Sequence, residues 1–76
     1  MYTSLDQLSA GDRCRVKKLK SDGTIRRRML DLGLVNDTLV EALQKSPSGD
    51  PTAYFIRGAV IAIRSDEASN IIVECV

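Results

Sequence analysis

Five short apolar stretches, each bounded by turn residues, constrain this chain more than any other feature of its sequence. In the first, 13–17, basic and apolar side chains alternate with a period of two, which is the pattern of a strand with one buried face. Four more candidate strands follow at close spacing: 38–43, 52–56, 59–64 and 71–75. The loop between the second and third, Ser46–Pro51, is rich in proline, glycine and serine and is expected to be exposed. Strands this short and this close together predict an all-β fold.

One short helix is expected between the first two strands. Thr24 is suited to cap its N-terminus, and Gly33 to end it as the first residue beyond the cap. Ile25, Met29 and Leu32 fall at i, i+4 and i+7, so they predict one narrow apolar stripe. A single helical turn is also expected over 65–70.

The N-terminal residues and the tight connection at Arg57-Gly58 complete the outline. Leu5 and Leu8 are placed in a short N-terminal turn, with Ser4 as its cap. Gly33 and Gly58 are assigned structural roles, since both stand where the chain must turn.

A chain of 76 residues has room for one domain, 1–76. Five strands and one helix of about two turns predict a small closed barrel, because closure removes the exposed sheet edges that a flat sheet would have. One residue set is expected to point inward: Cys14, Val16, Met29, Leu32, Val40, Ala42, Tyr54, Ile56, Ile61, Ile63, Ile71 and Val73.

The cysteine and histidine counts exclude the common zinc sites and the common forms of nucleophilic catalysis. The chain has no histidine, and its two cysteines, Cys14 and Cys75, lie near opposite ends. Common zinc sites need closely spaced cysteines or cysteine with histidine, so no metal site and no cofactor are predicted. Ser-His and Cys-His catalysis lack their base, and the five glycines form no phosphate loop, so the chain is not expected to be an enzyme. Without an export signal we expect a cytoplasmic protein with both cysteines reduced and buried, and a disulfide between Cys14 and Cys75 is the alternative.

The charge is unevenly distributed. Residues 13–28 hold eight basic residues and one acidic residue, a local charge of +7 in a chain whose net charge is +1. Such asymmetry bears on binding partners more than on fold.

Three consecutive arginines occupy the first turn of the expected helix. Arg26, Arg27 and Arg28 stand where the helix macrodipole is already positive, which costs about 0.3–1 kcal/mol for each. Leu30 lies beside them, off the apolar stripe, and Asp31 stands four residues after Arg27 in the less favourable orientation for a pair. We call these five residues the arginine patch and expect Arg26, Arg27 and Leu30, with Arg28 and Asp31 beside them, to dock on an acidic partner protein. The alternatives are that the arginines pair with carboxylates of this chain or bind a phosphate.

Two other binding roles for the basic Arg13–Arg28 segment are alternatives. A small barrel can bind nucleic acid, but stacking requires aromatic side chains and the chain has only three: Tyr2, Tyr54 and Phe55. A peptide-binding module of the Pro-rich type needs an aromatic-lined groove, which three aromatics can hardly build.

The run 26–34, Arg-Arg-Arg-Met-Leu-Asp-Leu-Gly-Leu, resembles the arginine-arginine-leucine-x-acid-x-glycine signature of the FeoA family of small cytosolic ferrous iron transport proteins. Further matches follow in the family's order and spacing along nearly the whole chain: 8–12, 49–51, 57–58, 61–64 and 67–68. One departure is Asn36-Asp37, where the family usually has a proline-glycine turn. Both residues tolerate turn geometry, so the fold is expected to persist.

The resemblance implies a five-stranded SH3-like small barrel with one short helix. It also implies an accessory role in ferrous iron uptake, with the FeoB transporter as partner through its cytosolic GTP-binding or membrane domain. The family is not regarded as binding iron itself, in line with the missing histidine. Modulation of FeoB by protein–protein interaction is therefore the expected function, with no nucleic acid and only indirect contact with the membrane.

Overall fold

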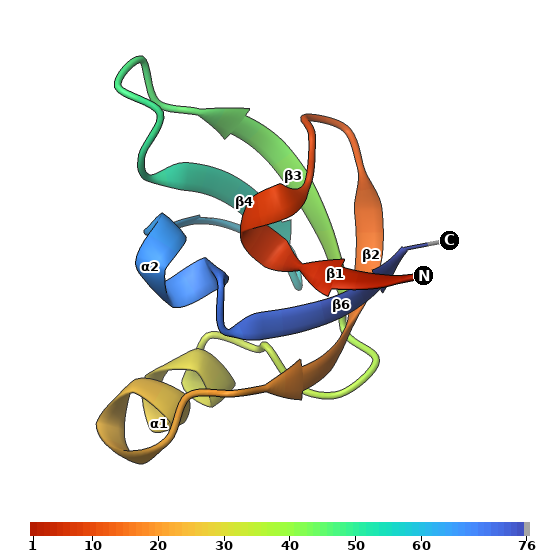
Figure 1. The fold of residues 1–76 in the computed structure, drawn as a ribbon, viewed down its shortest axis with the longest axis vertical. Helices are drawn as coiled ribbons and strands as arrows, with labels where there is room; N and C mark the ends of the chain where they lie inside the picture. The colour runs from red at the N-terminus through yellow and green to blue at the C-terminus, as the bar shows by residue number, and fades with distance from the viewer. Residues whose placement is uncertain (76) are drawn as a thin grey trace.

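The computed structural model describes residues 1–75 and shows one strongly curved antiparallel sheet with a short helix packed at one end (Figure 1). All five expected strands form. Two have the predicted bounds, and the others shift by one or two residues at one or both ends. The strands are β2 (Arg13–Leu19), β3 (Leu39–Lys45), β4 (Thr52–Ile56), β5 (Ala59–Ile63) and β6 (Ile71–Cys75), and the helices are α1 (Gly23–Asp31) and α2 (Ser65–Ala68).

A sixth strand precedes the five. β1 (Tyr2–Ser4) pairs antiparallel with β6 and leads directly into the 3₁₀ turn η1 (Leu5–Gln7). The sequence analysis does not separate this strand from the turn, because three residues are too few to show a period of two. Ser4 does stand at the cap position of η1, but its hydroxyl donates to the carboxylate of Asp6 and not to any backbone group.

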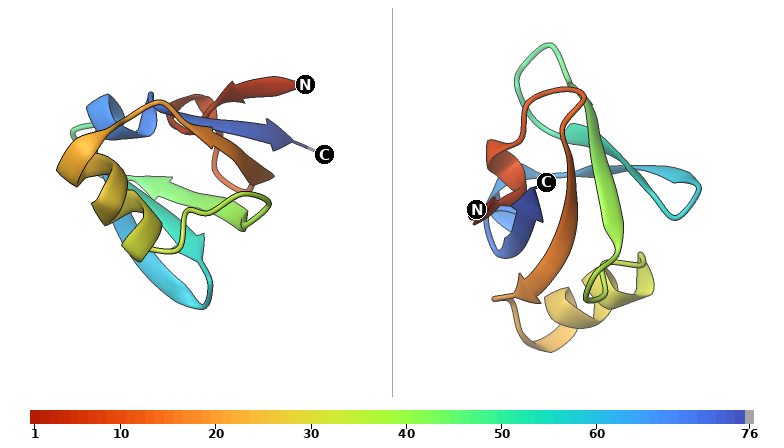
Figure 2. Two further views of the ribbon diagram at one scale, coloured as in Figure 1. Left: turned by 90° about the horizontal axis from the view of Figure 1, so that it is seen from below. Right: turned by 90° about the vertical axis from the view of Figure 1, so that its right-hand side faces the viewer.

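The strand order is β1-β6-β2-β3-β4-β5, and the end strands β1 and β5 do not pair with each other in the described chain. The sheet curls as an SH3-like barrel does, but the expectation of a fully closed barrel is wrong, because no hydrogen-bonded pairing joins the two end strands of the described chain. Register shifts in β2 (between Val16 and Lys18) and in β3 (between Ala42 and Gln44) help to curve it, since bulges bend strands. The β4–β5 hairpin projects from the body in both views of Figure 2.

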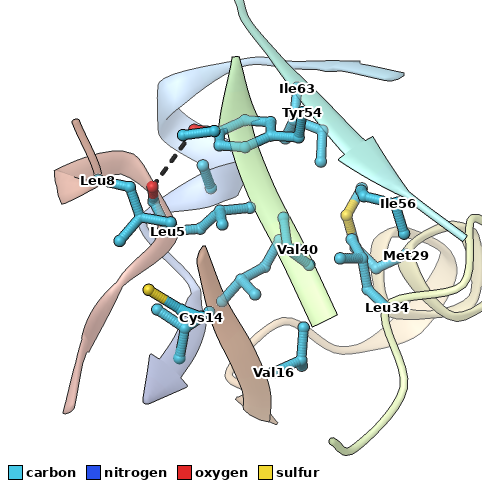
Figure 3. Close-up of a cluster of buried hydrophobic side chains, with 14 of the residues drawn as sticks. Leu5, Leu8, Cys14, Val16, Met29, Leu34, Val40, Tyr54, Ile56 and Ile63 are labelled. Atoms are coloured by element: carbon cyan, nitrogen blue, oxygen red, sulfur yellow. Dashed lines mark hydrogen bonds between the residues drawn. The ribbon is translucent and has the colours of Figure 1, made fainter. Parts of the chain in front are cut away.

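The core lies inside the curve of the sheet (Figure 3). Of the twelve residues predicted to point inward, ten are buried, and Leu32 and Ile61 pack partly buried against them. Five further apolar residues are buried that the sequence analysis did not place there: Leu5, Leu8, Leu19, Leu34 and Ala68. The Tyr54 hydroxyl donates a hydrogen bond of 3.3 Å to the Leu5 carbonyl, which ties β4 to η1.

Cys14 and Cys75 form a disulfide, so the expectation that both are reduced is wrong for this structure. The two residues are direct cross-strand partners in the β2–β6 ladder, with Cα atoms 4.1 Å apart. Antiparallel partners come this close only at non-hydrogen-bonded pairs, where the side chains meet. The sequence analysis indicates two inward-facing cysteines but not that their strands pair in this register.

Candidate functional site: helix α1 and the groove beside it

Helix α1 begins two residues earlier than expected and ends as predicted. The expectation that the three arginines occupy its first turn is therefore wrong: they follow Gly23, Thr24 and Ile25, and Arg28 lies in the last turn, where the macrodipole favours a cation. Asp22, not Thr24, takes the N-cap position, and its side chain makes no capping hydrogen bond. At the other end, the Gly33 amide donates to the Leu30 carbonyl (3.0 Å) and the Leu34 amide to the Met29 carbonyl (3.1 Å). This is the bonding pattern of a Schellman motif, and Gly33 has the positive φ, +101°, that the motif requires.

The Schellman turn brings two apolar side chains into the core. Met29 is 1% exposed, and Leu34, directly after the turn, is fully buried. Ile25, in contrast, is 46% exposed, so the predicted three-residue stripe is wrong at its first member. Met29, in the C-terminal half of α1, is the helical residue whose side chain is buried in the core, so the apolar packing of the helix is concentrated at that end.

The three arginines of the patch have different surroundings. Arg28 forms an ion pair with Glu67 of α2, as the alternative interpretation expects. One Arg26 guanidinium nitrogen (Nη1) donates to the Leu19 carbonyl at 3.2 Å. The Arg27 side chain is exposed and makes no hydrogen bond or ion pair with any residue of 1–75, and it does not pair with Asp31.

Leu30 and Arg26 line a shallow groove of about 260 Å³ between α1 and β2. Leu30 is 36% exposed, as its place off the stripe predicts. Lys17 and Lys18 of β2 line the same groove, and no acidic side chain does. The groove therefore joins an apolar floor to a cationic rim.

Lys18 is a candidate that the sequence analysis missed. The first strand was expected to end at Lys17, but β2 continues to Leu19 past a bulge that interrupts the simple alternation. Lys18 is exposed and forms no ion pair within the described residues.

Lys17 is held in place by two carboxylates. Its ammonium lies 2.5 Å from the Asp37 carboxylate and 3.7 Å from that of Glu74. The hydrogen bond to Asp37 raises the pKa of Lys17, and the same bond lowers the pKa of Asp37. Asp37 has φ +69°, so the Asn36-Asp37 turn adopts the left-handed geometry that these residues tolerate. Among the cations that line the groove, Lys17 therefore already pairs with carboxylates of this chain.

The described residues hold no group of three or more acidic or cysteine side chains that could bind a metal ion. No helix among them is long and apolar enough to cross a membrane.

Comparison with known proteins identifies the family. The FeoA domain matches residues 3–75. A curated relative from Porphyromonas gingivalis, a fusion of Fe(2+) transport protein A with the Fe(2+) transporter FeoB, is 29% identical over 72 residues. The match covers 95% of this chain but only 8% of that relative's length.

Two solved structures agree with the fold. The solution structure of the FeoA protein from Chlorobium tepidum is 35% identical, with a TM-score of 0.91 over 97% of this chain and 70% of that one. FeoA from Stenotrophomonas maltophilia, described as an SH3 domain protein, is 25% identical, with a TM-score of 0.84 over 95% of this chain and 89% of that one. The chain therefore belongs to the FeoA family of ferrous iron transport proteins.

Proposed function

We propose that this protein is a cytosolic accessory of a FeoB-type ferrous iron transporter, and that it docks on the transporter's cytosolic part and modulates it without catalysing a reaction. The observation that carries the proposal is the fused relative, in which a FeoA domain and FeoB occupy one chain. Joining two domains in one chain raises the effective concentration of each for the other, so fusion is an advantage when the two domains bind each other.

Arg27 and Leu30 are the centre of the proposed contact surface. Arg27 is an exposed cation near the middle of α1 that has no ion-pair partner among the described residues, so a carboxylate of the partner could pair with it without displacing a contact of this chain. Leu30 supplies apolar area beside it, and Arg26 and Lys18 extend the cationic rim. Arg28 contributes less, because Glu67 already neutralises it.

A contact of this size is expected to be weak and sensitive to salt. Small interfaces with charged rims bury less than about 1,200 Å² and form transiently. Rim charges act mainly on the association rate and on its dependence on ionic strength.

The test is the affinity of the full chain for the purified cytosolic domain of a FeoB protein. Arg27→Glu should weaken binding about tenfold, corresponding to about 1.4 kcal/mol, while the circular dichroism spectrum stays unchanged. Lys45→Glu is the matched control: it makes the same charge change at the far end of β3, beside the 46–51 loop and away from α1 (Figure 1). Because cytosolic thiols are normally kept reduced, binding is measured with and without a reductant.

Equal affinity of the parent and the Arg27→Glu variant would remove the arginine patch as the docking site. Equal weakening by both variants would indicate attraction of net charge without a defined patch. Retention of the protein on DNA or RNA, falling linearly with the logarithm of salt concentration, would favour the nucleic-acid alternative.

A further inference from the structure

Strand β5 is a free sheet edge with a defined set of outward backbone groups. The Arg57-Gly58 turn has positive φ at both residues, +49° and +84°, as a two-residue type I′ hairpin requires. In such a hairpin Ile56 and Ala59 exchange the first pair of hydrogen bonds, and bonded pairs then alternate along the strands. The amides and carbonyls of Val60 and Ala62 therefore point away from β4, and no other described strand pairs with them.

This edge lacks the features with which proteins usually protect free strands. Natural edges carry charged residues, prolines or bulges that prevent pairing with another chain. β5 reads Ala-Val-Ile-Ala-Ile and pairs with β4 in continuous register without a bulge. Val60 is 65% exposed, and its neighbour across the ladder, Phe55, is exposed as well.

A second apolar surface lies on the other face of β5. A groove of about 300 Å³ separates β5 from the C-terminal half of α1. Met29, Leu32 and Ile61 contribute apolar atoms to it, and the Arg28–Glu67 pair stands at its rim. A strand added along β5 would place alternate side chains beside Val60 on one face and in this groove on the other.

The charges at the two ends of β5 decide between possible occupants. Arg57 precedes the strand and makes no ion pair in the described chain, and Arg64 follows it with only a 3.9 Å contact to the exposed Asp66. A second copy pairing antiparallel about Ile61 would bring Arg57 of one copy beside Arg64 of the other at both ends. Like charges so placed oppose self-pairing, whereas carboxylates at both ends of a foreign strand would be attracted.

We propose that β5 binds an extended segment of a partner protein as an added strand, and that this segment has alternating apolar residues with a carboxylate at each end. Main-chain hydrogen bonds to Val60 and Ala62 would supply affinity, and the two flanking arginines would select the acidic ends. This surface is distinct from the arginine patch, and its occupation does not depend on docking at α1.

The test uses two synthetic peptides added to the isotope-labelled full chain in NMR titrations. The first is Glu-Val-Thr-Val-Thr-Val-Glu, and the second has lysine in place of both glutamates. The acid-ended peptide should shift the amide signals of 59–64 and slow hydrogen exchange at Val60 and Ala62. The lysine-ended peptide should bind at least about tenfold more weakly, because it places cations beside Arg57 and Arg64.

Two variants make the result specific. Ala62→Pro removes an outward amide that does not bond to β4, a position where an edge strand tolerates proline, and it should abolish binding. Val60→Lys introduces the charge that natural edges carry, at a side chain already in solvent, and should also abolish binding. It serves as the test if the proline variant does not fold.

Three outcomes would overturn the proposal. They are absence of binding by the acid-ended peptide at millimolar concentration, unchanged binding in a folded Val60→Lys variant, and signal changes centred outside 59–64. Concentration-dependent protection of Val60 and Ala62 without any peptide would assign the edge to a second copy and would likewise overturn it. None of these outcomes bears on the Arg27→Glu experiment, so the two proposals can fail separately.

Discussion

Helix α1, which carries the arginine patch, is anchored by a single fully buried side chain of its own, that of Met29. Met29→Ala removes that anchor and leaves a cavity between the helix and the sheet. Truncation of a buried methionine costs about 2–5 kcal/mol. A chain of this length has a total free energy of unfolding of roughly 4–11 kcal/mol, so the substitution should remove a large part of it.

Ile25→Ala is the matched control, since it shortens an apolar side chain of the same helix that is already half in solvent. It should cost less than about 1 kcal/mol, because alanine also has the higher helix propensity. In a domain of this size each kcal/mol shifts Tm by about 4–8 °C, so Met29→Ala should lower Tm by at least about 8 °C.

Urea unfolding followed by circular dichroism measures both values, and amide hydrogen exchange shows where stability is lost. Faster exchange in 23–31 with protected sheet amides would show that the helix detaches locally before the barrel unfolds. Equal costs for Met29→Ala and Ile25→Ala would refute the reasoning, because they would mean that the helix packs through the whole stripe.

Two further predictions concern turn residues that follow this helix along the chain, Gly33 and Asp37. Gly33→Ala should lose about 1–2 kcal/mol from its positive φ. The new methyl would lie 2.6 Å from Cδ of Arg57, but this side chain is exposed and can move aside, so Gly49→Ala, with φ +92° and open space around it, should lose about as much. A much larger loss at Gly33 than at Gly49 in thermal unfolding would contradict this. Asp37→Asn should lower Tm at neutral pH but not at pH about 2. The pKa of Asp37 is lowered in the fold, so its bond to Lys17 stabilises the folded state fully at pH values above the ordinary pKa of 3.8. This contribution is lost as the pH falls through the lowered pKa. Asparagine tolerates the φ of +69° at this turn, and a Tm difference that does not change with pH would show that the charge is not involved.

The predicted strands that match best are those whose turns carry strong local signals. The bounds of β4 and β6 agree with the prediction at both ends, and each strand is flanked by turn or helical residues. β2 was cut short because its bulge after Val16 breaks the period of two, and β1 was missed because a three-residue strand depends on its pairing with β6. Period indicates which side of a strand is buried, but not which strand lies beside it, so neither the open ladder nor the Cys14–Cys75 pairing could be derived.

The candidate site shows the same division between local and long-range information. That three arginines stand together on one helix is visible in the sequence, but not that the helix begins at Gly23 and so places them beyond its first turn. That Arg28 differs from Arg27 is not, because the difference comes from Glu67, 39 residues away along the chain and adjacent only after α2 packs beside α1. Lys18 enters the site for a similar reason, since only the bulged path of β2 brings it to the groove.

A net charge of +1 conceals how the charges of this chain are divided between folding and binding. The carboxylates that approach cations in the described chain are Asp37 and Glu74 at Lys17, Glu67 at Arg28 and, at 3.9 Å, Asp66 at Arg64. Arg27, by contrast, stands on α1 without such a partner, as does Arg57 at the start of the β5 edge. Because exposed charges are screened at high ionic strength while the buried apolar core is not, salt should weaken contacts made through these arginines without unfolding the domain. Arg27 and Arg57, which have no ion-pair partner among the described residues, are thus cations that the two proposals assign to binding, and an almost neutral chain presents cationic surfaces because its carboxylates lie elsewhere.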